Sequence, residues 1–408
     1  MRAKIILCLL VVLSLLFYCQ KEKSTEPVPD NGLHPQVDLP WPSLADSPWP
    51  IANGNVQRTG RSRFQGPQQG IIEWTYPDEG QYLMENNSSA VIGEDGTIYF
   101  TTNRHLHALR PDGSLKWKFT PDRMMGGSPM IGIGDIIYVC AGEAIGSSVY
   151  NGCYYALQND GSIIWEFLTQ EGLFGYGDAI GLDGSIYFTG AEGTLYALNK
   201  DGTLKFKTKG VGGFISGRSS IAVSPDGLTL YVSGLDSTLN AIDAHTSSIN
   251  WRFFRGENFN NANHMVDCEG NIYSYAKEQG EYTIISLTAK GELRWEFKHG
   301  VLNDFNATCD MHLDKNGNIY FSTNTKFCSL DYDGNLRWSV LFKGQSPTGA
   351  ILGDVDGIIY FGWDYLLAYN QNGNKKFECN LRFPLVAGAI SDNKSLYVCA
   401  EPKFYCIK

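Results

Sequence analysis

The side chains that most often carry chemistry are sparse in this sequence. His105 and His107 stand two residues apart at the start of a predicted strand, so both would point to the same face. Such a pair could supply half of a zinc site, which normally needs three or four ligands. A solvent-exposed pair beside a hairpin explains the same spacing. No G-x-S-x-G elbow, H-E-x-x-H helix or phosphate-binding loop is present. We therefore predict no catalytic residues, no metal site and no cofactor.

Several turns carry acidic and amide side chains that could bind calcium. Asp314 to Gly317, Asp-Lys-Asn-Gly, has the composition of the start of a calcium loop. The glutamate that closes such a loop is absent at the required spacing. Asp, Asn and Gly are also the residues that tight turns favour. Hairpin turn chemistry therefore accounts for these segments.

The chain has ten cysteines and no C-x-x-C spacing. Cys140 and Cys153 fall on adjacent predicted strands, as do Cys399 and Cys406. An oxidising compartment would permit a disulfide in each pair. Buried thiols that pack as small apolar side chains are the alternative.

These side chains are carried by a repeat of short apolar runs separated by turns. The copy that spans residues 89–119 has four runs rich in β-branched, aromatic and aliphatic residues. Turns at Asp95-Gly96 and Asp112-Gly113 lie between runs. Asp-Gly turns tolerate positive φ and close two-residue hairpins. The runs are too short for helices, which argues against a helical repeat. Four short antiparallel strands per unit are typical of a propeller blade.

Two recurring aromatic positions count the units. Seven steps from Trp74 to Phe377 average about 43 residues each. A side chain needed in every unit favours packing between blades over cofactor stacking. The second strand carries a tyrosine, namely Tyr99, Tyr138, Tyr187, Tyr231, Tyr273, Tyr320, Tyr360 or Tyr397. The fourth strand carries Trp74, Trp117, Trp165, Phe206, Trp251, Trp295, Trp338 or Phe377.

The two series are offset in a way that predicts a closed ring. Trp74 lies in a predicted fourth strand, residues 71–76, with no first three strands before it. Three strands follow Phe377, near residues 385–390, 395–399 and 404–407, with no fourth after them. An N-terminal strand that completes the C-terminal blade removes the exposed sheet edges. The predicted fold is therefore all-β, an eight-bladed propeller over residues 48–408.

The loops between a fourth strand and the next first strand depart most from the repeat. A scaffold that varies in one set of loops usually carries recognition there. Aromatic, amide and charged side chains in these loops would suit a peptide, a protein loop or a glycan. The candidate binding residues are Arg123, Phe174, Tyr176, Phe214, Arg218, Asn261, His264, Asp304 and Phe305.

The N-terminus has the features of an export signal. Arg2 and Lys4 precede an apolar run over residues 5–18, which is short for a membrane span. Cys19 follows, and the arrangement resembles a bacterial lipoprotein signal in which that cysteine receives the lipid. Tyr18 departs from the small residue of that pattern, so an ordinary secretory signal and an uncleaved anchor remain alternatives. We predict a signal at 1–18 and a Pro-rich tether at 19–47.

The repeat resembles the pyrroloquinoline-quinone-like (PQQ-like) propeller family. The clearest copy runs from Gly184-Ser-Ile-Tyr-Phe through Leu195-Tyr-Ala-Leu-Asn to Leu204-Lys-Phe206. One branch of that family comprises quinoprotein dehydrogenases, which hold PQQ and calcium under an adjacent cysteine pair that this sequence lacks. The other is a non-catalytic, BamB-like lipoprotein branch. The resemblance implies a lipid-anchored protein of this second kind.

Charge and family resemblance together define the expected function. The formal net charge is −10 and no basic run lies beyond the N-terminus, which excludes a nucleic-acid backbone binder. We predict an exported, monomeric, non-enzymatic propeller of the cell envelope, attached to the outer membrane only by its lipid. Its loop face would bind a protein or polymer partner. The alternatives are a PQQ-dependent dehydrogenase and a surface glycan-binding protein.

Overall fold

The chain divides into two units, Met1–Leu33 and His34–Lys408, and the second unit is described here. The described residues contain no helix long and apolar enough to cross a membrane. Cys19, with the predicted signal and the first part of the tether, lies outside them. The computed structural model describes residues 33–77, 88–143, 151–173, 175, 177–211, 220–234, 236–254, 263–278, 281–300, 311–323, 325–342, 349–362, 364–381, 385–400 and 402–408.

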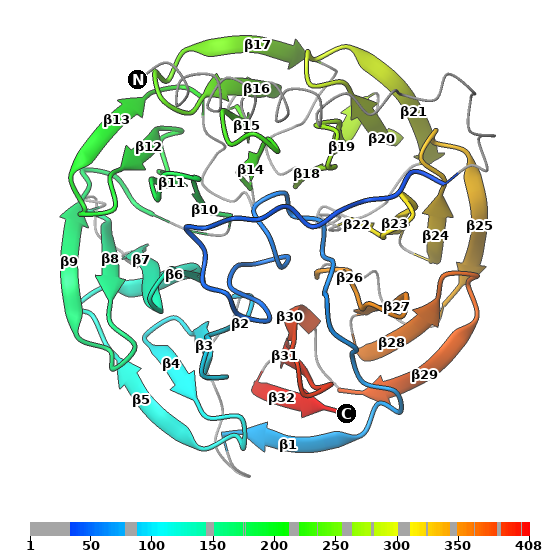
Figure 1. Cartoon of the computed structure of the whole chain (residues 1–408), viewed down its shortest axis with the longest axis horizontal. Coiled ribbons are helices and arrows are strands. Elements are labelled where there is room, and N and C mark those ends of the chain that lie inside the picture. The colour runs from blue at the N-terminus through cyan, green and yellow to red at the C-terminus, as the bar shows by residue number, and fades with distance from the viewer. Residues whose placement is uncertain are drawn as a thin grey trace, which may run out of the picture. The chain divides into compact units, whose positions relative to one another are not determined.

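The second unit is an eight-bladed β-propeller, as predicted. Its described residues form 32 strands in eight four-stranded antiparallel sheets arranged around a common axis (Figure 1). Seven blades use four consecutive strands each, with the first strand innermost. Short Asp-Gly and Asn-Gly turns join successive strands because glycine takes the positive φ that these turns require, as at Gly96 and Gly113.

The strand bounds follow the predicted repeat closely. The first three blades are β2 (Val91–Ile92), β3 (Ile98–Thr101), β4 (Leu106–Leu109) and β5 (Leu115–Phe119); β6 (Met124–Gly132), β7 (Ile136–Glu143), β8 (Cys153–Leu157) and β9 (Ile163–Leu168); β10 (Ala179–Ile180), β11 (Ile186–Thr189), β12 (Leu195–Leu198) and β13 (Leu204–Thr208). The next two are β14 (Ala222–Val223), β15 (Thr229–Ser233), β16 (Thr238–Asp243) and β17 (Ile249–Phe254); β18 (His264–Val266), β19 (Ile272–Glu278), β20 (Glu281–Leu287) and β21 (Leu293–Gly300). The last three are β22 (His312–Leu313), β23 (Ile319–Ser322), β24 (Lys326–Leu330) and β25 (Leu336–Leu341); β26 (Leu352–Gly353), β27 (Ile358–Gly362), β28 (Tyr365–Asn370) and β29 (Lys375–Asn380); β30 (Leu385–Ile390), β31 (Leu396–Ala400), β32 (Lys403–Ile407) and β1 (Ile72–Tyr76).

The two aromatic series are packing elements, as predicted. In each blade the buried tyrosine of the second strand contacts the aromatic of the fourth strand, with ring centroids 5.7–6.4 Å apart. The fourth-strand tryptophan also reaches the next blade, where the Trp251 indole N–H donates to the Ala289 carbonyl at 3.0 Å. Gly291 lies against the same ring, and a Cβ there would stand 2.7 Å from it. The same indole-to-carbonyl bond recurs at Trp74, Trp117, Trp165, Trp295 and Trp338.

The ring closes as predicted, through β1 in the last blade. β1 pairs antiparallel with β32, and Trp74 lies opposite Cys406. Gly70 precedes β1 and contacts Phe377 of the preceding blade, as the turn glycines of other blades contact their tryptophans. The core continues across the junction, where Phe404 stacks on Phe100 with centroids 4.3 Å apart. Strand β1 and the C-terminal strands therefore form one continuous packing unit with the first blade.

An N-terminal segment, residues 49–62, crosses the end of the axis at which each first strand meets its turn (Figure 1). We call it the axial strap. Its carbonyls accept hydrogen bonds from the inner strands of six blades: Trp49 from Ile92, Pro50 from Ile131, Val56 from Val223, Gln57 from Val266, Thr59 from Leu313 and Gly60 from Gly353, at 2.8–3.1 Å. The predicted recognition loops lead into the opposite ends of those strands. The strap therefore occupies the other face of the ring.

Candidate functional site

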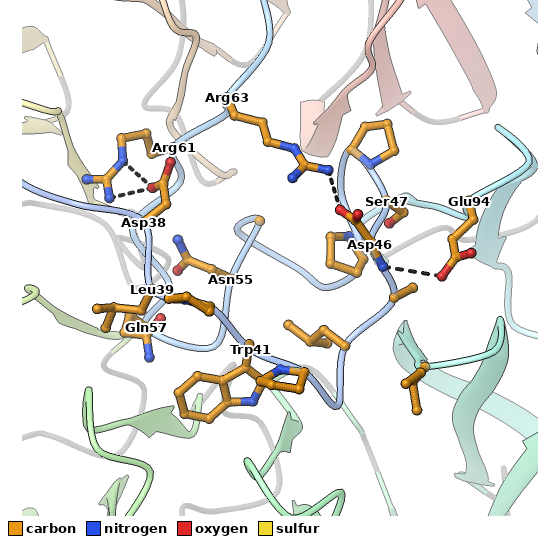
Figure 2. A pocket seen from close by; sticks show the side chains of 18 residues that line it. Asp38, Leu39, Trp41, Asp46, Ser47, Asn55, Gln57, Arg61, Arg63 and Glu94 are labelled. Atoms are coloured by element: carbon orange, nitrogen blue, oxygen red, sulfur yellow. Dashed lines mark hydrogen bonds and ion pairs between the residues drawn. The ribbon is translucent and has the colours of Figure 1, made fainter. Parts of the chain in front are cut away.

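A cavity among the described residues lies over the axial strap. It encloses about 680 Å³ and is lined almost entirely by residues 38–63, with Glu94 from the β2–β3 turn and Ile133 from the β6–β7 turn (Figure 2). We call it the axial pocket. Because the strap is hydrogen-bonded to six inner strands, the floor of this pocket is preformed.

Two ion pairs cross the axial pocket and join its walls. Arg61 contacts Asp38 with its Nη2 2.6 Å from Oδ1, and its Nε lies 2.9 Å from the same oxygen. Arg63 contacts Asp46 at 2.7 Å. The Arg61 side chain is only 8 % exposed, so its pair is the better shielded from solvent screening. These contacts hold residues 38–47 across the strap.

One side of the axial pocket is apolar. Trp41 is half-buried, and its indole N–H donates to the Ile180 carbonyl at 2.8 Å. Four prolines, Leu39 and Leu44 complete this side. Leu44 also forms a backbone bridge with Gly132 of β6. An apolar wall beside a few fixed charges is the usual composition of a binding pocket.

Residues 34–47, which we assigned to a tether, pack on the propeller. The backbone N–H of His34 donates to Asn316 and that of Gln36 to Lys315, and the His34 ring stacks on Tyr332 at 4.0 Å. The axial pocket is absent from the sequence-based prediction for this reason. Trp41 was the available signal, because disordered linkers are poor in aromatic residues and this one lies between two prolines.

Most of the predicted loop residues lie outside the described residues: Phe174, Tyr176, Phe214, Arg218, Asn261, Asp304 and Phe305. Arg123 lies just before β6, where its guanidinium contacts the Asn151 carbonyl at 3.2 Å and the Asp122 carboxylate at 2.7 Å. The prediction that His264 lies on the loop surface is wrong. It is the first residue of β18 and is 1 % exposed, because its ring fits between the hydroxyls of Ser233 and Ser274 at 2.8 and 2.9 Å.

His264 belongs to a buried polar group near the strap. Burial lowers the pKa of His264 to about 3, and the positive charge of Arg58 acts in the same direction. Burial raises the pKa of Asp178 to about 7, although it accepts a hydrogen bond from Tyr154 at 2.9 Å. Cys140 lies beside Asp178, and burial raises the pKa of its thiol. Asp178 is therefore only partly ionised at neutral pH.

The buried histidine predicts a pH dependence of stability. An unfolded histidine binds its proton near pH 6.5, whereas folded His264 stays neutral to about pH 3. The unfolded state binds more protons over that interval, so His264 reduces stability as the pH falls below 6.5. Asp178 has the opposite effect, because the folded state binds more protons than the unfolded state between about pH 7 and 4. Its contribution to stability is the same in wild type and in a His264 variant, so it cancels when the two are compared. We expect His264→Gln to be less stable than wild type at pH 7, with the gap about 2 kcal/mol smaller at pH 5.

Equilibrium urea unfolding at both pH values measures that gap. His245→Gln on the exposed β16–β17 turn is the matched control, and its free energy of unfolding should change with pH as that of wild type does. A constant gap between wild type and His264→Gln would contradict the assignment of a neutral, buried imidazole.

Neither predicted disulfide is present among the described residues. Cys140 lies opposite Tyr154, the residue after Cys153, so the two side chains point to opposite faces of the blade. Cys399 lies opposite Phe404, two residues from Cys406, which offsets the pair diagonally. The Cys406 thiol contacts the Glu73 carboxylate at 3.4 Å instead.

The His105–His107 pair is not the exposed pair that the hairpin interpretation predicted. His107 is 3 % exposed, and its ring stacks on Phe100 with centroids 4.9 Å apart. Burial lowers its pKa to about 3. Within the described ranges, no group of three or more His, Cys, Asp or Glu side chains could hold a metal ion.

The described residues do not fit the calcium-bound quinone of the PQQ dehydrogenases. Calcium takes about six to eight oxygen ligands, and carboxylates supply the charge that balances the ion. Asp178 is the buried carboxylate in the polar group, but its raised pKa and the nearby charge of Arg58 both oppose a cation there. The carboxylates of Asp314 and Asp354 are each occupied by backbone N–H groups and a tyrosine hydroxyl. These two groups close turns, as the sequence indicated.

Comparison with known proteins confirms the PQQ-like resemblance. Residues 151–300 match the family model of the outer membrane protein assembly factor BamB. No curated protein matches the chain.

Solved structures share the fold at low identity. BamB from Moraxella catarrhalis is 13 % identical, with 83 % of this chain and 99 % of that chain covered and a TM-score of 0.60. The quinohemoprotein alcohol dehydrogenase from Comamonas testosteroni is 15 % identical, with coverage of 88 % and 80 % and a TM-score of 0.66. A europium-containing methanol dehydrogenase is 10 % identical, with coverage of 87 % and 89 % and a TM-score of 0.64. The likeness therefore includes both enzymes and an assembly factor.

Proposed function

We propose that this PQQ-like propeller is a non-enzymatic binding protein of the cell envelope that takes a protein partner at the axial pocket. The single observation that carries the proposal is the cavity itself. It is preformed on a strap fixed to six inner strands, and it combines an apolar wall with oriented charges. That composition suits recognition of a partner that inserts a side chain or a short segment.

The state of the polar groups favours binding over catalysis. Asp38 and Asp46 are each held by an arginine, so neither carboxylate is placed as a base next to a nucleophile. A guanidinium does not titrate in the physiological range and donates fixed hydrogen bonds. These features support a site that orients a partner.

The envelope location of this function rests on the sequence. The lipoprotein-like signal supports export and attachment through a lipid on Cys19. The match of residues 151–300 to the BamB family model supports a role among envelope proteins. The loop face, with Phe214 and Phe305 among its predicted residues, is a second surface that a partner could use.

Affinity purification from native envelope membranes tests the binding function. Ile133 is 65 % exposed at the rim of the axial pocket, so Ile133→Lys should place a longer, charged side chain in the entrance without disturbing the fold. We expect wild type to retain a partner and Ile133→Lys to retain at least tenfold less. Leu341→Lys is the control, because Leu341 is 74 % exposed on the outer strand β25. Equal recovery with Ile133→Lys would refute binding at the pocket.

A PQQ-dependent dehydrogenase is the second candidate, favoured by the likeness to quinohemoprotein alcohol dehydrogenase. Purified protein mixed with PQQ and calcium, then desalted, provides a direct comparison. We expect no quinone absorbance to stay with the protein. Retained quinone at one equivalent would favour the enzyme over the binding protein.

A further inference from the structure

The axial pocket contains one carboxylate that its own charges do not neutralise. The pocket is lined by three carboxylates and two guanidiniums. Asp38 is paired with Arg61 at 2.6 Å and Asp46 with Arg63 at 2.7 Å. Among the described residues, Glu94 has no ion-pair partner, and its Oε1 accepts only a 3.3 Å hydrogen bond from the backbone N–H of Asp46. The described pocket therefore has an excess of one negative charge at its Glu94 side.

Among the described residues, the wall of the axial pocket also contains buried polar atoms that lack partners. They are the Gln57 side-chain nitrogen, the Arg61 Nη1 and the Ser47 hydroxyl. Gln57 and Ser47 are 4 and 5 % exposed. Because these atoms are closed off from the open space of the pocket, Glu94 is the charged group that a guest can reach.

Trp41 leaves its ring face as the surface through which it can interact. The indole N–H is already bonded to the Ile180 carbonyl, which fixes the edge of the ring. The ring is half-buried beside Pro40 and Pro42 in the pocket wall. An apolar face of this kind suits the aliphatic stem of an arginine, which packs along apolar surface while its charged head stays at a polar group.

We infer that the axial pocket binds an arginine side chain on an extended segment of the partner protein. The guanidinium is placed at Glu94, and its aliphatic stem packs on the Trp41 wall. A neutral glycan would leave the Glu94 carboxylate without a counter-charge, and a lone cation would leave the apolar wall uncovered. This inference rests on the proposed function, because it names the chemistry that the partner presents to the same pocket.

A matched pair of peptides tests the inference. The probe is acetyl-Gly-Ser-Arg-Ser-Gly-amide, and its twin carries citrulline, which is a neutral isostere of arginine. We expect the arginine peptide to bind the full-length protein at least tenfold more tightly in ligand-observed NMR titrations. Raising the salt from 50 to 500 mM should weaken the arginine peptide selectively, because added ions screen the exposed Glu94 charge.

Two variants test charge recognition at Glu94. Glu94→Gln should reduce the affinity for the arginine peptide to that for its citrulline twin. Glu166→Gln on the outer strand β9 makes the same charge change away from the pocket and should have no effect. Equal affinities of the two peptides for wild type, or no effect of Glu94→Gln, would overturn the inference. Binding of an N-acetylglucosamine trisaccharide without the arginine peptide would also overturn it.

The partner-recovery experiment distinguishes this inference from the proposed function. Loss of the partner with Ile133→Lys but full recovery with Glu94→Gln would leave binding at the pocket intact and reject the arginine. Loss with both variants supports the two together. Full recovery with both, despite selective binding of the arginine peptide, would reject the partner site and retain the chemistry of the pocket.

Discussion

A chain that ends at Ala400 is expected not to form a stable propeller. The deletion removes β32, the strand that joins β31 to β1, so the last blade loses two of its three strand pairings. The side chains of Phe404, Tyr405, Cys406 and Ile407 are all 6 % exposed or less. Burial of one large apolar side chain contributes about 1.5–3 kcal/mol, and a whole domain is stable by about 5–15 kcal/mol. The loss is comparable to the entire stability.

Soluble expression and thermal melting followed by circular dichroism measure this effect. The control begins at Leu33 and so removes only residues before the propeller unit. We expect the control to melt within about 2 °C of wild type, since 1 kcal/mol moves the melting temperature of a large domain by roughly 2–4 °C. A chain truncated at Ala400 that melts cooperatively at the wild-type temperature would contradict closure through β1 and β32.

Replacement of Trp251 by alanine is expected to cost about 3 kcal/mol. Deletion of a fully buried tryptophan costs about 3–5 kcal/mol, and Trp251 is half-buried, so the lower end applies. The change removes the contacts with Tyr231 and Gly291 and the hydrogen bond to the Ala289 carbonyl. Trp251→Phe should cost less, because a smaller ring remains and the lost hydrogen bond accounts for about 1 kcal/mol.

Phe254→Ala supplies the matched control for Trp251→Ala. Phe254 is on the same strand, β17, and is 67 % exposed, so we expect a change within about 0.5 kcal/mol. Urea unfolding of the three variants gives the order. If Trp251→Ala were no more destabilised than Phe254→Ala, the tryptophan would not be a contact between blades.

The blade count and ring closure were predictable because the same pattern of packing residues recurs in all eight blades. Trp74 and Tyr397 belong to one blade although they lie at opposite ends of the chain, and the offset between the two aromatic series indicates this without coordinates. The strands near 385–390 and 404–407 were placed within a residue or two for the same reason. Where the strand bounds of a single copy are ambiguous, comparison with the other copies of the repeat indicates them.

The axial pocket was not predictable, because nothing in it repeats. Asp38 and Arg61 are neighbours only after residues 49–60 have crossed six blades, and no periodicity indicates that path. Composition made residues 34–47 look like a linker, since prolines and polar residues outnumber apolar ones there. The backbone hydrogen bonds of His34 and Gln36 fix that segment, and backbone bonds leave no signature in the sequence.

His264 was placed in a recognition loop for a related reason. The residues just before it, 260–263, are mostly asparagine, and the bounds of short inner strands are set by tertiary contacts rather than by propensity. The two serines that surround its ring come from β15 and β19, and their side chains satisfy a histidine that would be costly to bury alone.

Site-specific photo-crosslinking in native membranes tests the central claim, partner binding at the axial pocket, most directly. A photoreactive phenylalanine analogue replaces Ile133 at the pocket rim or, in the control, Leu341 on the outer strand β25. We predict one discrete adduct from position 133, in an amount that the Glu94→Gln substitution reduces, and no adduct from position 341. Adducts that form equally at both positions, or only at position 341, would contradict it.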